Sequence, residues 1–221
     1  MKPWIGLLTL HCLLSFSIAD TKTLYSNALS FYKSGQLEEA LETVDKLLEE
    51  SEAYAPGREL KGRIYTAQDK LDLALEQFDK AIALDSKRAS IHFYVGEVFF
   101  IQERWSEAYG AYRYAIEVDS EYRKPILKLI YCLIIMENYP RAHKWVTALN
   151  PTDELKPDYY FARAAMALAT GTLDNYINAL RQARTIYGTD TFNRYEPDLL
   201  RTTQWIKKRQ KERETTSPQT S

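Results

Sequence analysis

The sequence predicts an all-α solenoid of about five helix-turn-helix repeats, and its regular columns of small residues carry that prediction. One column recurs at a constant step and holds Ala28, Gly62, Gly96 and Ala164, with Ile130 interrupting it. A second column at the same step holds Ala40, Ala74, Ala108 and Ala142, and Tyr176 ends it. Self-similarity at a fixed step of about 34 residues is typical of proteins built from stacked repeats.

Inside each repeat the apolar residues follow helical spacing. In the second repeat, a helical pattern of apolar residues runs through Leu71, Ala74, Leu75 and Phe78, after a short polar turn at 69–70. Two antiparallel helices joined by so short a turn cross closely, and Ala or Gly at the crossing lets the backbones approach. Only eight Gly and eight Pro occur in the whole chain, which favours a well-packed helical protein.

A secretory signal peptide is predicted over positions 1–19. A positive start at Lys2 precedes an apolar run from Trp4 to Ile18, and Ser17 and Ala19 supply small residues for cleavage after Ala19. The run is shorter than the ~20 apolar residues that span a membrane, although an uncleaved N-terminal anchor stays the alternative. We therefore expect an exported protein, periplasmic or secreted, with no integral membrane span after cleavage.

The repeats are predicted to fill residues 20–188, with repeats starting near residues 21, 55, 89, 123 and 157. Residues 189–214 follow as one more helix, with an apolar side at Leu199, Trp205 and Ile206. A solenoid needs a cap over its last hydrophobic face, and this helix is the natural candidate. Residues 215–221 are polar and predicted to be a disordered tail.

The sequence contains no motif that indicates catalysis, a metal or a cofactor. His92 and His143 lie in different repeats, and no H-x-x-x-H, C-x-x-C or glycine-rich phosphate loop occurs. Cys132 stands in an apolar helical run and is interpreted as a buried hydrophobic residue. The balance of 29 Lys and Arg against 30 Asp and Glu argues against a nucleic-acid partner, which needs a basic face. We expect no enzymatic activity and no cofactor.

The repeat resembles the tetratricopeptide repeat family. That family has small residues at positions 8, 20 and 27 of a 34-residue unit and large residues at positions 11, 17 and 24. Position 11 here reads Phe31, Tyr65, Phe99, Leu133 and Ala167. The family's Trp at position 4 and Pro at position 32 are absent, and the fourth and fifth repeats depart most. The resemblance covers about residues 21–187 and implies a right-handed α-solenoid with a concave groove.

The resemblance also implies which residues line that groove, namely positions 2, 5, 9 and 12 of the first helix of each repeat. Carried onto this chain, those positions are mostly aromatic and aliphatic, and such exposed apolar area marks a binding surface. The candidate partner-binding residues are Tyr25, Leu29, Tyr32, Arg63, Phe93, Glu97, Phe100, Leu127, Tyr131, Ile134 and Phe161. Coverage of the groove by the C-terminal helix is the alternative.

The expected function is a non-enzymatic protein-protein interaction scaffold, or adaptor, of the bacterial cell envelope that holds a partner peptide or helix in its groove. The alternative is a structural or self-assembling subunit of an envelope complex of the secretion or pilus type. The oligomeric state stays open at this point, as does the host, because a signal peptide also fits secretion in eukaryotes.

Overall fold

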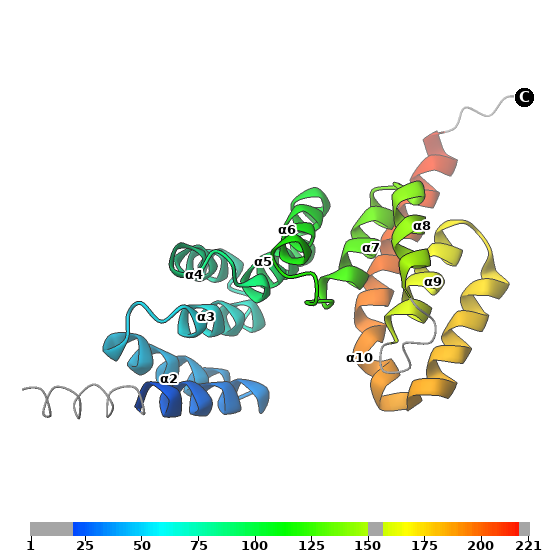
Figure 1. Cartoon of the computed structure of the whole chain (residues 1–221). Coiled ribbons are helices and arrows are strands. Elements are labelled where there is room, and N and C mark those ends of the chain that lie inside the picture. The colour runs from blue at the N-terminus through cyan, green and yellow to red at the C-terminus, as the bar shows by residue number, and fades with distance from the viewer. Residues whose placement is uncertain (1–19, 150–156, 217–221) are drawn as a thin grey trace, which may run out of the picture. The chain divides into compact units, whose positions relative to one another are not determined.

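The computed structural model describes residues 20–149 and 157–216, and within these ranges the chain forms helices joined by turns, with no strand (Figure 1). The all-α repeat architecture is therefore confirmed. The expected signal peptide lies outside the described residues, as do residues 217–221 of the expected tail. Among the described helices, none is both long enough and apolar enough to cross a bilayer.

The chain divides into two compact units, residues 1–98 and 99–221, with the division inside one helix. We call the described parts the N-terminal unit and the C-terminal unit. The N-terminal unit contains a helix over residues 20–33, α2 (Leu37–Glu50), α3 (Ala55–Ala67), α4 (Leu71–Leu84) and most of α5 (Ala89–Ile101). The C-terminal unit contains α6 (Trp105–Val118), α7 (Pro125–Ile135), α8 (Tyr139–Ala148), α9 (Asp158–Ala169) and α10 (Leu173–Thr216).

The small columns of the sequence lie where neighbouring helices cross in the N-terminal unit. Ala28, Ala40 and Ala74 are fully buried. A Cβ atom added to Gly62 of α3 would lie 2.5 Å from the ring of Phe78 on α4, closer than packed carbon atoms approach. The constant step of the repeat therefore places small side chains at the closest contacts, as its pattern predicts.

The turns between the paired helices are short because single residues reverse the chain. Gly35, with φ of 80°, stands between the helix over 20–33 and α2, and Asp69, with φ of 59°, stands between α3 and α4. Pro56 lies in the first turn of α3 and Pro125 begins α7, where a missing N–H costs no helical hydrogen bond.

The C-terminal unit is organised around α7, in which every residue from Pro125 to Ile135 is buried. Helices α6, α8 and α9 each pack against α7. The long α10 is kinked at Gly188, whose φ of 76° and ψ of 172° are non-helical and essentially restricted to glycine. After the kink, the second part of α10 turns back to lie along α7 and α9 (Figure 1). We call this part, residues 189–216, the covering helix.

Candidate functional site

Six of the predicted groove residues lie in the N-terminal unit and are half-buried there, on three different helices. They are Tyr25, Leu29, Tyr32, Arg63, Phe93 and Glu97. The guanidinium carbon of Arg63 on α3 lies 4.8 Å from the ring centroid of Tyr32 and 4.6 Å from that of Tyr94 on α5. Arg63 therefore contacts the first helices of the preceding and the following repeat. We call the surface formed by these three helices the inner face of the N-terminal unit.

A buried carboxylate organises the charges at this face. Glu59 is only 4% exposed, and its Oε2 accepts hydrogen bonds from Arg88 Nε at 2.6 Å and from Ser90 Oγ at 2.8 Å. Its other oxygen lies 3.9 Å from Nη1 of Arg63, which is long for an ion pair. Glu59 is thus hydrogen-bonded mainly by Arg88 and Ser90, and its ion pair with Arg63 lacks a short hydrogen bond.

Arg63 keeps hydrogen-bonding capacity at the inner face. A guanidinium carries five N–H donors, and among the described residues its buried Nε has no hydrogen-bond partner. The side chain is 16% exposed, so part of it stays accessible between the two tyrosine rings. A planar cation held this way can accept a carboxylate from a partner in two-point contact.

Burial raises the pKa of Tyr25 above its ordinary value, Glu59 adds to the rise, and Arg63 opposes it. Burial also raises the pKa of Tyr94, where Arg63 again lowers it and Glu59 raises it. Both phenols therefore stay protonated at neutral pH, and each can donate a hydrogen bond to a peptide carbonyl.

The other five predicted groove residues are buried in the C-terminal unit, which differs from the expectation that they line an open surface. They are Phe100, Leu127, Tyr131, Ile134 and Phe161. The ring of Phe161 lies 5.4 Å from that of Phe192 and 5.1 Å from that of Tyr195, both on the covering helix. The covering helix therefore buries Phe161, whereas the Phe100 ring packs edge to face on Trp105 of α6, with centroids 5.0 Å apart.

Several residues of these surfaces are not predicted by the sequence. Tyr94 stands next to Phe93 but outside the groove positions, and Arg88 lies in the turn before α5. Nothing in the sequence pairs Arg88 with Glu59, 29 residues away. The sequence does signal a helix here, because its apolar residues recur at steps of three and four.

Within residues 20–149 and 157–216, no cluster of three His, Cys, Asp or Glu side chains is placed to hold a metal ion. Cys132 is buried in α7, as its apolar surroundings predict. The inner face presents aromatic rings, phenolic hydrogen-bond donors and one stacked cation.

Two family models match the chain, one described as TPR repeat over residues 62–102 and one described as tetratricopeptide repeat over residues 21–49. This chain is a tetratricopeptide repeat protein. A comparison with curated proteins finds no match. The matched ranges fall in the first three repeats, where the column residues follow the family's pattern most closely.

Solved structures share the fold at low sequence identity. A thermophilic TPR protein from Thermus thermophilus is 18% identical with a TM-score of 0.66, and the match covers 81% of this chain and 99% of that one. A tetratricopeptide repeat protein from Parabacteroides merdae is 16% identical with a TM-score of 0.62, over 86% and 78%. The TPR protein YrrB is 18% identical with a TM-score of 0.57, over 79% and 90%.

Proposed function

We propose that this tetratricopeptide repeat protein is a non-enzymatic interaction scaffold that holds a peptide segment of another protein on the inner face of its N-terminal unit. The observation that carries the proposal is the half-buried set of Tyr25, Leu29, Tyr32 and Phe93 around the stacked Arg63. Aromatic residues and arginine are the side chains that dominate binding energy at protein interfaces. YrrB, which shares the fold, is described as having an unusual peptide-binding site, and this supports a peptide as the class of ligand.

The chemistry of the peptide follows from the charges at the inner face. Arg63 is flanked by two aromatic rings and has only a long contact with Glu59, which Arg88 and Ser90 already hold. A ligand carboxylate would therefore form charge-assisted hydrogen bonds with Arg63 donors that the long ion pair with Glu59 does not use. The bound segment would carry one Asp or Glu between aromatic or aliphatic residues, whose side chains contact Tyr25, Leu29 and Phe93.

The proposed setting is the cell envelope, after export directed by residues 1–19. A second candidate, a self-assembling subunit of an envelope complex, is favoured by the apolar side chains that the first part of α10 exposes. Leu173 is 59% exposed and Ile177 is 43% exposed on this helix. Light scattering separates the two candidates: a monomer at high concentration supports the adaptor, and growth with concentration supports the subunit.

A peptide panel tests the adaptor function directly. The probes are short synthetic peptides with one Glu between two aromatic or aliphatic residues, and a matched panel with Gln in place of Glu. We expect the Glu peptides to bind the full chain and Arg63→Gln to weaken that binding at least about tenfold, since a hydrogen-bonded charge pair contributes ~1.5–3 kcal/mol. Fluorescence anisotropy with labelled peptides measures both affinities.

The matched control is Arg113→Gln, which makes the same change at an exposed arginine of α6 that pairs with Glu117. This variant should bind the Glu peptides as tightly as the unmodified chain. Equal binding of the Glu and Gln panels, together with no effect of Arg63→Gln, would contradict the proposed site.

A further inference from the structure

The inner surface of the C-terminal unit already holds a helix, which is part of the same chain. Along the covering helix, residues that face α7 and α9 recur at steps of three and four, at Phe192, Tyr195, Leu199, Thr202 and Ile206. Leu199 is 2% exposed, Thr202 is fully buried and Ile206 is 6% exposed. This is the pattern of an amphipathic helix lying in an apolar groove.

The contacts of the covering helix reach from its start almost to its end. Near its start, Phe192 and Tyr195 contact Phe161 of α9, and Asp198 forms an ion pair with Lys128 of α7 at 2.9 Å. Further along, the Trp205 ring meets the Trp105 ring of α6 edge to face, with centroids 5.5 Å apart. The helix therefore covers the groove positions that a bound partner would otherwise contact.

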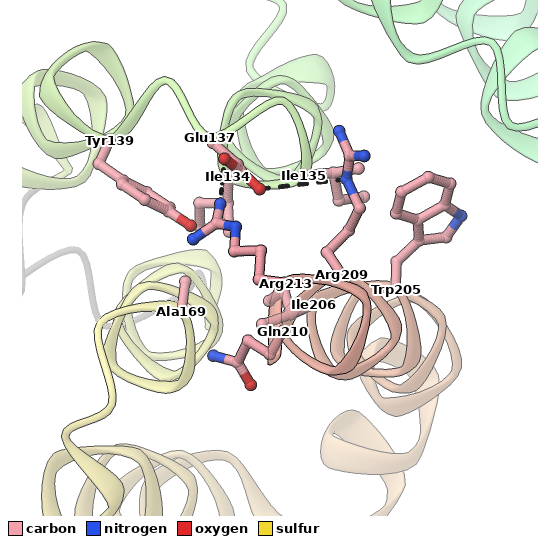
Figure 2. A pocket seen from close by; sticks show the side chains of 10 residues that line it. All are labelled: Ile134, Ile135, Glu137, Tyr139, Ala169, Trp205, Ile206, Arg209, Gln210 and Arg213. Carbon is pink, nitrogen blue, oxygen red and sulfur yellow. Dashed lines mark ion pairs between the residues drawn. The ribbon is translucent and has the colours of Figure 1, made fainter. Parts of the chain in front are cut away.

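Near its C-terminal end the covering helix is held by ion pairs. Figure 2 shows Glu137, in the turn between α7 and α8, pairing with both Arg209 and Arg213 of the covering helix. The Arg209 contact is 4.0 Å long. A cationic end on the helix thus matches an acidic residue at the rim of the groove.

The fit of this internal helix is incomplete. Three polar atoms at or beside the contact are buried without a hydrogen-bond partner among the described residues: Tyr131 Oη, Trp105 Nε1 and Trp205 Nε1. A small pocket of about 30 Å³, partly open to solvent, also lies between α7, α9 and the covering helix, lined by Ile134, Ala169, Ile206 and Arg209 among others (Figure 2). Buried polar groups without partners weaken a packed contact.

The covering helix is joined to the rest of α10 through the single non-helical residue Gly188. A change in the backbone angles of this residue alone can swing the helix away while residues 173–187 stay packed on α9. The groove can therefore be vacated by a hinge motion, without unfolding the helices that form it.

We propose that the inner surface of the C-terminal unit is a second binding site, which takes an amphipathic helix of another protein in exchange for the covering helix. The covering helix shows the chemistry that fits: bulky apolar residues at i, i+3, i+7 and i+14, a small residue at i+10, and arginines one to two turns later. Residues 189–216 act as an internal competitor for this site. The site is independent of Arg63 and of the peptide surface of the N-terminal unit.

The test uses the full chain and a labelled synthetic peptide of residues 189–216 as the probe. The double variant Leu199→Asp, Ile206→Asp places charges on the buried side of the covering helix and should release it. We expect this variant to bind the labelled peptide at least tenfold more tightly than the unmodified chain does. A peptide carrying the same two substitutions should not bind, and Leu200→Asp, which changes a neighbouring leucine that is 48% exposed, should leave binding as in the unmodified chain.

Three results would overturn the proposal. The double variant could fail to bind the probe, or it could lose the helix content of the C-terminal unit by circular dichroism, which would make residues 189–216 a fixed part of the core. Alternatively, the unmodified chain could form dimers by light scattering that the double variant does not form, which would assign the groove to a second copy of this chain. Arg63→Gln should change none of these readouts, so failure here and failure of the peptide site are distinguishable.

Discussion

Gly62 and Gly110 are both glycines within helices, yet their surroundings differ in a way that decides what each position tolerates. A Cβ atom at Gly62 would lie 2.5 Å from the ring of Phe78, which is itself fully buried. At Gly110 of α6, no atom lies within 4 Å of the same added carbon. Gly62 allows two helices to approach closely, whereas Gly110 only increases the conformational entropy of the unfolded chain.

We predict that Gly62→Ala destabilises the protein by about 1–3 kcal/mol, because the added methyl group forces the Phe78 ring out of a packed position. Gly110→Ala should stabilise it by up to about 1 kcal/mol, because alanine favours a helix interior over glycine. Urea unfolding followed by circular dichroism measures both changes. Destabilisation of the same size in both variants would show that Gly62 is not at a helix crossing.

Among the helices, the contact between α7 and the covering helix determines whether the inner surface of the C-terminal unit is exposed or covered. Helical periodicity and the polar turn at Gly188 predict a helix after residue 188, and that much follows from the sequence. Periodicity cannot say whether such a helix closes the end of a solenoid or lies along its inner surface, because both positions require one apolar side. Only the burial of Tyr131 and Phe161 beneath it distinguishes the two arrangements.

The buried phenol of Tyr131 makes this contact sensitive to alkaline pH. Burial raises the pKa of Tyr131 well above its ordinary value of 10.0, and the charge of Asp198 on the covering helix adds to the rise. Above about pH 10 the unfolded chain loses this proton while the folded chain keeps it, so the contribution to stability is full below pH 10 and falls as pH rises. Melting should therefore occur at lower temperature as pH rises from about 9 to 11.

Tyr131→Phe isolates this effect, because it removes a hydroxyl that is buried without a hydrogen-bond partner among the described residues. We predict a smaller drop in melting temperature with alkaline pH than in the unmodified chain, and no loss of stability at pH 8. Fluorescence of Trp105, Trp145 and Trp205 follows the melting, since all three lie in the C-terminal unit. Identical pH slopes for the two proteins would contradict the burial of Tyr131.

At the scale of the whole molecule, the two units offer different kinds of surface. The constant step of the repeat predicts the helices and, in the N-terminal unit, their crossings, and the resemblance to the family points to Tyr32, Arg63 and Phe93 as residues of one face. What it does not predict is the charge arrangement at Glu59, which depends on Arg88 from the next repeat. Nor does it predict which groove positions are covered, because that depends on how a distant helix folds back.

We propose that the inner face of the N-terminal unit holds a partner peptide, and cross-linking can identify that peptide. Site-specific photo-cross-linking in the native host tests it most directly, with a photoreactive amino acid placed at Tyr32, at Phe93 or, as a control, at Leu73, an exposed residue of α4. We predict that Tyr32 and Phe93 capture the same segment of one protein, with a carboxylate among apolar residues, and that Arg63→Gln reduces the yield of capture. Equal capture from Leu73, or a yield that Arg63→Gln leaves unchanged, would contradict the proposed peptide site.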